Sequence, residues 1–143
     1  MPGDILFEME FASHSLNAHP QAGKIRAILS AALEAADPAS AIRAELTRRA
    51  DWIASARCVF LLSVGKAGIR MADAALPFLT DSLAGGLIIT KNASRVTTGL
   101  LRVYEADHPI PGARSLQAGQ RVLDLISHFT SDDLLVCLFS GGA

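Results

Sequence analysis

Residues 58–68 decide the fold, and they read Cys58-Val59-Phe60-Leu61-Leu62-Ser63-Val64-Gly65-Lys66-Ala67-Gly68. The first five are an unbroken apolar run, so both faces of the strand that they form should be buried, as in a parallel sheet. Gly65 ends the run, and an Ala-rich helix is predicted from about residue 67 to 76. A buried strand that turns through glycine into a helix indicates the start of a β-α-β unit.

Working outward, we predict three further strands at residues 85–90, 101–106 and 134–139, the last of them buried. Apolar residues at helical spacing predict a long helix before the fourth strand; they are Ala118, Val122, Leu125, Ile126 and Phe129. Only about ten residues join the second and third strands, close to the lower limit for a parallel crossover. The third strand is therefore either parallel or antiparallel, and we favour parallel.

Ahead of the first strand, residues 21–36 carry apolar side chains at helical spacing. The next helix carries Ile42, Leu46 and Trp52 on one face. Residues 1–20 show no period and are expected to form an irregular leader. The expected fold is therefore α/β and Rossmann-like, a mostly parallel sheet flanked by helices and preceded by a helix pair.

Composition excludes several classes of protein. The net charge is −1 and the charges are spread along the chain, so there is no basic stripe for nucleic acid. No apolar run approaches the ~18 residues that span a bilayer. The first residues carry acids and lack an apolar h-region, so they are not a signal peptide. Cys58 and Cys137 lie in apolar runs, which favours two buried thiols of a cytoplasmic protein over a disulfide.

The last four residues, Ser-Gly-Gly-Ala, follow the predicted fourth strand directly. A glycine loop at the end of a parallel strand normally leads into a helix that covers the sheet. We therefore expect a truncated gene product or a fragment, and the alternative is a small domain with a frayed end.

The strand–helix turn at Gly65, Lys66 and Ala67 is a candidate phosphate site. Glycine lets the backbone approach a ligand, helix N-terminal N–H groups attract an anion, and the lysine adds a full charge. It is not a Walker A loop, because Phe60 stands at the first glycine position and Ala67 at the Ser/Thr position. The alternative is an ordinary tight turn with a solvated lysine.

A second small-residue loop, Ser140, Gly141 and Gly142, follows the fourth strand. If the first and fourth strands are neighbours across a topological switch, both loops flank one crevice, where ligands of open α/β sheets bind. The alternative is a simple chain-end loop.

His108 and Lys91 are candidate substrate-binding residues. His108 lies in a stiff turn with two prolines and could hold a carboxylate or move a proton, and Lys91 ends the second strand. The alternatives are a histidine that caps its own loop and an exposed lysine. No His, Cys, Asp and Glu cluster has metal-ligand spacing, so no metal site is predicted.

Together these segments resemble the glycerate 2-kinase (class II glycerate kinase) family, whose full-length members add a C-terminal MOFRL domain. The matching segments run in order within residues 21–143 and include VGKAGIRMADAA, GLIITK, EADHPIPGARSLQAGQRVLDL and DDLLVCLFSGGA. The resemblance implies that residues 21–143 are the N-terminal part of the nucleotide-binding domain and that the MOFRL domain is absent. It implies a kinase that uses ATP and Mg²⁺ to phosphorylate D-glycerate to 2-phosphoglycerate.

The resemblance also implies residue roles. Lys66 matches a catalytic lysine of the family, and residues 140–142 match the start of its SGGxSA loop. The family's turn reads Gly-His-Pro-Val-Pro-Asp, but here Asp107 replaces that Gly and Gly112 replaces that Asp. The family's Asp at the position of Gly112 is an acid that could place substrate or metal, and this chain lacks it there.

The chain alone is expected to be inactive, because half of the ligand cleft would be missing. One alternative is a hydroxypyruvate reductase using NAD(P)H, which the missing GxGxxG fingerprint disfavours. The other is a non-catalytic sugar-phosphate-binding module. Assembly into a homodimer is a further possibility that the sequence leaves undecided.

Overall fold

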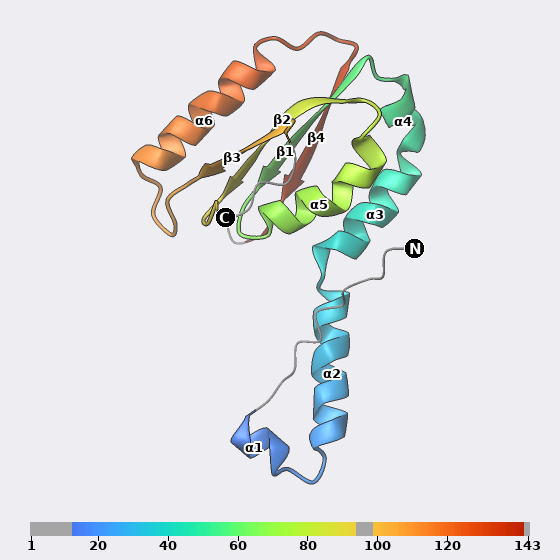
Figure 1. Cartoon of the computed structure of the whole chain (residues 1–143), viewed down its shortest axis with the longest axis vertical. Coiled ribbons are helices and arrows are strands. Elements are labelled where there is room, and N and C mark those ends of the chain that lie inside the picture. Colours follow the sequence, from blue (N-terminus) through green and yellow to red (C-terminus); the bar gives the residue numbers. More distant parts are fainter. Residues whose placement is uncertain (1–12, 94–98, 142–143) are drawn as a thin grey trace. The chain divides into compact units, whose positions relative to one another are not determined.

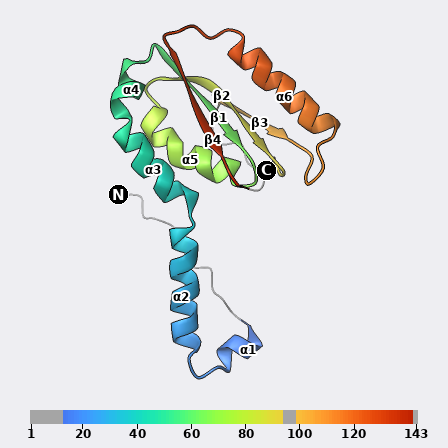
Figure 2. The same cartoon turned by 180° about the vertical axis from the view of Figure 1, so that it is seen from behind.

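The computed structural model describes residues 13–93 and 99–141 (Figures 1 and 2). The chain divides into two compact units, residues 1–37 and 38–143. The first unit holds α1 (His14–Asn17) and α2 (Ala22–Ala35), so the helix predicted over 21–36 is confirmed. Residues 14–17 form a single helical turn inside the segment expected to be irregular, because Ser13 Oγ accepts the Leu16 N–H and caps that turn.

The second unit holds all the strands. Its elements are α3 (Pro38–Arg48), α4 (Ala50–Ser55), β1 (Cys58–Val64), α5 (Gly68–Leu79), β2 (Leu83–Thr90), β3 (Leu101–Glu105), α6 (Ala113–Ile126) and β4 (Asp133–Phe139). The four predicted strands are therefore confirmed to within two residues at each end.

The sheet has the strand order β3-β2-β1-β4, and all three pairings are parallel. The parallel orientation favoured for β3 is confirmed. The chain builds outward from β1 to β2 and β3, then returns to the other side of β1. The topological switch therefore lies between β1 and β4, and the fold is the expected Rossmann-like α/β arrangement.

Helices cover both faces of this sheet. The helices α3, α4 and α5 lie on one face and α6 lies on the other (Figures 1 and 2). The core between α5 and the sheet includes Val59, Leu61 and Leu79, which have no exposed surface. Burying a side chain of this size stabilises the folded state by roughly 1.5–3 kcal/mol. In β2, Gly86 lies so close to the Leu61 carbonyl that a Cβ there would overlap it.

The position of β4 corrects two predictions. We expected a buried strand, but β4 lies at the edge of the described sheet, and Phe139 is 66% exposed. None of the described residues pairs with the outer side of β4. Cys137 is exposed and Cys58 is half-buried, so the prediction of two buried thiols is wrong. The apolar run predicts a strand, but it does not say how many neighbours that strand has.

The predicted helices of two aromatic residues are wrong. Trp52 is not on the buried face of α3, because it belongs to the separate short helix α4 and is 60% exposed. The Arg49 guanidinium lies 4.5 Å from the centre of its ring. Phe129 follows α6 rather than belonging to it, and its ring stacks on Phe60 with centroids 4.4 Å apart.

Candidate functional site

The carboxyl ends of all four strands meet at one edge of the sheet, because every pairing is parallel. Val64 is in register with Ile89 on one side and Phe139 on the other, so three strands end level. The predicted site residues Gly65, Lys91 and Ser140 directly follow these ends, and His108 follows β3. The prediction that the glycine loops share one sheet edge is confirmed. Gly142 lies outside the described residues.

The β1–α5 turn is fixed by its backbone. Gly65 has φ +112°, a conformation that side-chain-bearing residues rarely adopt. The buried Ser63 hydroxyl donates to the Gly68 carbonyl oxygen at 2.8 Å, which joins the end of β1 to the start of α5. The Gly65 N–H donates to the Ile89 carbonyl oxygen at 2.9 Å, which extends the ladder toward β2. Ser63 was overlooked as a structural residue, although it stands just before the glycine.

The two predicted phosphate loops touch. The Ser140 N–H donates to the Val64 carbonyl oxygen at 3.0 Å, and the Ala67 N–H donates to Ser140 Oγ at 3.5 Å. A Cβ on Gly65 would overlap Ser140 Oγ. The two loops therefore form one continuous surface at the topological switch.

The N-terminus of α5 opens onto this surface. Its N-cap residue is Ala67, which offers no side-chain acceptor to the first helical N–H groups. The first amides of an α-helix have no partner within the helix, and together with the helix dipole they attract an anion. Lys66, just before the cap, is exposed and adds a full positive charge beside them.

The N-terminus of α6 is different, because an acid of the same chain fills it. Asp107 Oδ2 accepts the N–H groups of Arg114 at 3.0 Å and Ser115 at 3.4 Å. The Arg114 side chain donates to Asp107 Oδ1 at 2.6 Å and to Glu105 Oε1 at 2.6 Å. The hydrogen bond from the Arg114 side chain is the main cause that lowers the pKa of Asp107 below its usual range.

Asp107 and Arg114 were not predicted as a pair. A helix cap is normally sought at the N-cap position, and Gly112 occupies it here. The available signal was an acid five residues before a glycine N-cap, across a turn that two prolines stiffen.

The candidate side chains along this edge do not contact one another. Within the described parts of the chain, no hydrogen bond or ion pair joins the side chains of Lys66, Lys91 and His108. Lys91 is exposed and His108 is half-buried. Since neighbouring strands lie about 4.8 Å apart, the ends of β1 and β3 are separated by roughly 10 Å.

Residues 24–143 match a domain of unknown function, DUF4147. The chain belongs to the DUF4147 family. Its sequence is 36% identical to the D-glycerate 2-kinase of Thermotoga maritima over 85 residues, which are 59% of this chain and 20% of that protein. The predicted resemblance to glycerate 2-kinases is confirmed.

Two further relatives carry different names. An Agrobacterium vitis protein provisionally named hydroxypyruvate reductase is 33% identical over 118 residues, covering 82% of this chain and 26% of that protein. The glycerate 2-kinase of Picrophilus torridus is 29% identical over 120 residues, covering 83% and 29%. The DUF4147 chain therefore spans between a fifth and a third of the length of these relatives.

A solved structure agrees with the fold. The crystal structure of glycerate kinase from Thermotoga maritima superposes with a TM-score of 0.56 at 36% sequence identity. The superposed part covers 61% of this DUF4147 chain and 21% of the other.

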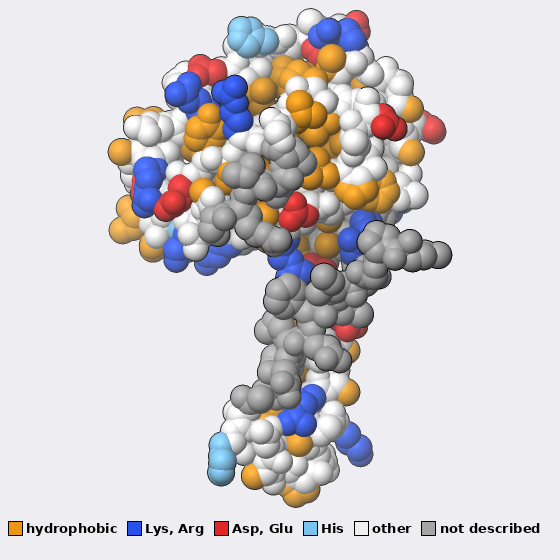
Figure 3. Space-filling view, viewed as in Figure 1, with side chains coloured by type: hydrophobic (Ala, Val, Ile, Leu, Met, Phe, Trp, Pro, Cys, Tyr) orange, Lys and Arg blue, Asp and Glu red, His pale blue; other side chains and the backbone are white. Residues whose placement is uncertain are grey.

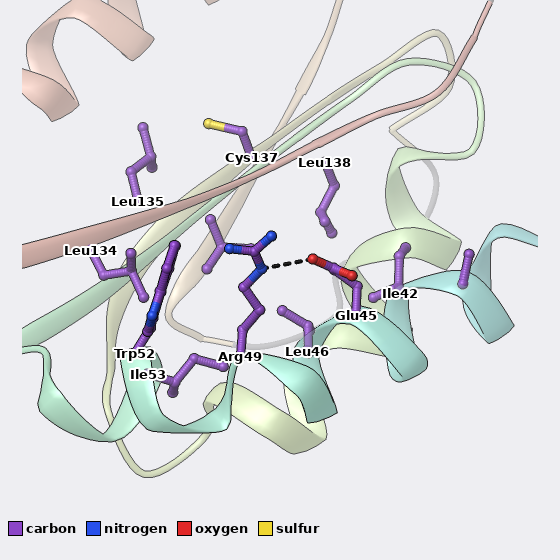
Figure 4. Close-up of a pocket in the computed structure, with 12 residues that line it drawn as sticks. Ile42, Glu45, Leu46, Arg49, Trp52, Ile53, Leu134, Leu135, Cys137 and Leu138 are labelled. Carbon is purple, nitrogen blue, oxygen red and sulfur yellow. Dashed lines mark hydrogen bonds and ion pairs between the residues drawn. The ribbon is translucent and has the colours of Figure 1, made fainter.

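One cavity of the DUF4147 chain lies away from the loop edge. It encloses about 420 Å³ between β4 and the α3–α4 helices. Figure 4 shows Leu134 and Leu138 pointing from β4 toward these helices, while Leu135 and Cys137 point to the other side of the strand. Arg49 donates to Glu45 at 2.7 Å on the helical wall (Figure 4). The groove is apolar, and none of the predicted site residues lines it.

A buried acid ties the opposite edge of the sheet together. The Asp133 side chain is 1% exposed and lies 2.8 Å from Arg57. The Thr130 N–H and hydroxyl donate to Asp133 Oδ2 at 2.9 and 3.0 Å. The Thr130 N–H is the largest cause that lowers the pKa of Asp133. This cluster joins the starts of β1 and β4 and is structural.

On the face seen in Figure 3, acidic and basic side chains are interspersed. In the part of the chain that the structure describes, no helix combines the length and apolarity needed to cross a bilayer. The same residues contain no group of three metal-ligating side chains that could hold an ion.

Proposed function

We propose that this DUF4147 domain binds the phosphates of ATP at residues 65–67 and 140–142, and takes part in phosphorylation of the 2-hydroxyl of D-glycerate to 2-phosphoglycerate. Gly142 lies outside the described residues and stays a prediction. The observation that carries the proposal is the contact between Ser140 and the β1–α5 turn, beside an α5 N-terminus without a side-chain cap. The names of the relatives support the choice of reaction.

The chemistry suits these parts. Phosphoryl transfer depends mainly on positioning and on neutralising the charge of the transferred group. The Gly68 N–H already donates to the Gly65 carbonyl oxygen at 3.0 Å, so other N–H groups of the first turn of α5 would hold phosphate oxygens. The Lys66 ammonium would balance charge on the transferring group. Mg²⁺, when bound to the nucleotide, would neutralise further charge on the phosphate oxygens. The described residues offer no cluster to hold the metal, so we assign none of them to it and derive no step through it.

The substrate would lie beside the nucleotide along the same edge. D-glycerate carries a carboxylate, which the exposed Lys91 ammonium can pair with. His108 is half-buried and offers ring nitrogens that can donate to the carboxylate or accept the hydroxyl proton. The ends of β1 and β3 are separated by roughly 10 Å, which would set the phosphates and the glycerate on neighbouring loops. ATP as the donor and two free cysteines are typical of a cytoplasmic protein.

The name hydroxypyruvate reductase on two relatives provides a second candidate. A nicotinamide enzyme of this fold usually needs three glycines at the first turn. Here that turn has Gly65 and Gly68 with Lys66 between them, which suits a polyphosphate better. A module that binds a sugar phosphate without turnover is the third candidate.

ATP binding to the 143-residue chain tests the proposal. Lys66→Ala should weaken binding at least tenfold in calorimetric titration, since a hydrogen bond to a charged group contributes about 1.5–3 kcal/mol. Lys24→Ala is the matched control, because Lys24 is an exposed lysine of α2. Equal ATP affinity of wild type and Lys66→Ala would remove Lys66 from the site.

Turnover separates the three candidates. The turnover assay uses a longer protein that contains this domain and matches the relatives in length. With ATP, Mg²⁺ and D-glycerate it should form 2-phosphoglycerate, and the Lys66→Ala substitution should lower its turnover rate about 10²-fold. The 143-residue chain should bind ATP without turnover. NADH with hydroxypyruvate should give no protein-dependent oxidation. Nicotinamide oxidation without ATP-dependent product would favour the reductase.

A further inference from the structure

The turn of residues 108–112 is clamped at both of its ends by one acid. Asp107, just before the turn, accepts the N–H groups of Arg114 and Ser115, just after it. Its own N–H donates to Ser115 Oγ at 3.1 Å. Arg114 binds Asp107 and Glu105 together through separate nitrogens. His108 is therefore the first residue inside a closed clamp.

The position of the Asp107 carboxylate depends on the absence of a side chain at Gly112. A Cβ at position 112 would lie 2.7 Å from Asp107 Oδ2, so a side chain there would push the carboxylate off the helix. An acid at 112 itself would be a normal N-cap of α6. The N-terminus of α6 can thus be filled from position 107 or from position 112, but not from both. Both positions depart from the Gly-His-Pro-Val-Pro-Asp pattern, as does Ile110 at its Val position, and the departures at 107 and 112 compensate each other.

We propose that Asp107 and Gly112 form a matched pair, and that Asp107 is the positioning residue that holds His108 at the ligand edge. The proposal rests on the proposed function for the identity of the ligand, D-glycerate. Asp107 does not touch the ligand itself, because its carboxylate is occupied by the N-terminus of α6 and by Arg114. It acts through the backbone that joins it to His108.

The experiment compares four variants of the 143-residue chain by NMR of the His108 imidazole cross-peak and by thermal melting. The variants are Asp107→Ala, Gly112→Asp, the exchange of both (Asp107→Gly with Gly112→Asp), and Asp81→Ala, an exposed acid outside the clamp. Asp107→Ala should shift and broaden the His108 cross-peak and lower Tm by about 4 °C. Gly112→Asp should disturb the same cross-peak, because two carboxylates compete for one site.

The exchange variant decides the pairing. It should restore a sharp His108 cross-peak and most of the lost Tm, while Asp81→Ala changes neither. An unchanged His108 cross-peak in Asp107→Ala would overturn the positioning role. An exchange variant as disturbed as the sum of its single variants would overturn the matched pair.

Titration with D-glycerate separates positioning from capping alone. Wild type should show a D-glycerate-dependent shift of the His108 cross-peak, and Asp107→Ala should lose it while keeping ATP-dependent shifts of the Gly65 amide. A D-glycerate shift that is undiminished in Asp107→Ala would overturn the positioning role. No D-glycerate shift in wild type would overturn the proposed ligand, and the variants would still decide the matched pair.

Discussion

Replacing Gly65 with alanine tests the geometry of the turn on which the candidate site is built. The backbone there has φ +112°, and holding a residue with a side chain in such a region costs roughly 1–3 kcal/mol. The new Cβ would also overlap Ser140 Oγ. Moving that hydroxyl breaks two long hydrogen bonds, to the Ala67 N–H and the Val64 carbonyl oxygen, at a further cost of about 0.5–1 kcal/mol.

The expected loss of stability is therefore roughly 2–4 kcal/mol, which for a unit of this size lowers Tm by about 10–15 °C. Urea unfolding followed by circular dichroism measures the free energy directly. Ser140→Gly removes the atoms that the new Cβ meets, so the double variant should recover about 1 kcal/mol relative to the sum of the two single variants. Gly119→Ala is the matched control, because nothing lies within 4 Å of a Cβ there, in the middle of α6.

The control should move in the opposite direction, since alanine stabilises a helix interior by about 1 kcal/mol over glycine. A Gly65→Ala chain that melts within 1 °C of wild type would refute the left-handed turn. Strict additivity of Gly65→Ala and Ser140→Gly would refute the contact between the two loops, and the shared phosphate surface with it.

Two more predictions concern stability. Gly86→Ala should destabilise the fold by about 3 kcal/mol or more in urea unfolding, because its Cβ would meet the Leu61 backbone carbonyl, which has no room to yield; a loss below 1 kcal/mol would contradict the close approach of β1 and β2. Asp107 and Asp133 both have pKa values below the usual value for aspartate. Below about pH 4 the unfolded state therefore binds more protons than the folded state. The free energy of unfolding falls as the pH drops through the folded-state pKa values. Urea unfolding at about pH 7 and pH 3 should therefore show a smaller acid loss in Asp107→Asn and in Asp133→Asn than in wild type, and an equal loss would count against these ion pairs.

The sequence was sufficient to predict the sheet and the edge at which the loops of its parallel strands meet. The unbroken run before Gly65 predicted a buried parallel strand, and β1 is buried with a partner on each side. The fold rule that places loops of parallel strands at one edge then brought Gly65 and Ser140 together correctly. These features follow from local patterns and from connectivity, which a single sequence contains.

What the sequence did not predict depends on neighbours in space. The run of residues 134–138 is as apolar as β1, yet among the described residues β4 pairs with β1 alone, and Cys137 is exposed. Trp52 fits the helical period of α3, but a break after Arg48 turns it toward solvent. The Asp107 clamp was missed because its carboxylate reaches past the N-cap position, which no helix-start rule anticipates.

The side of β4 with which no described strand pairs has a consequence for purification. A strand edge normally avoids recruiting other strands through a charge, a proline or a bulge, and residues 134–139 contain neither a charge nor a proline. The pairing of β4 with β1 runs without a register shift, so no bulge bends the edge away either. Such an edge is a template for adding strands from other molecules, and it makes self-association at high protein concentration the expected practical limit on purification. A single lysine in place of Cys137, on the exposed side of the strand, is the smallest change that would blunt it.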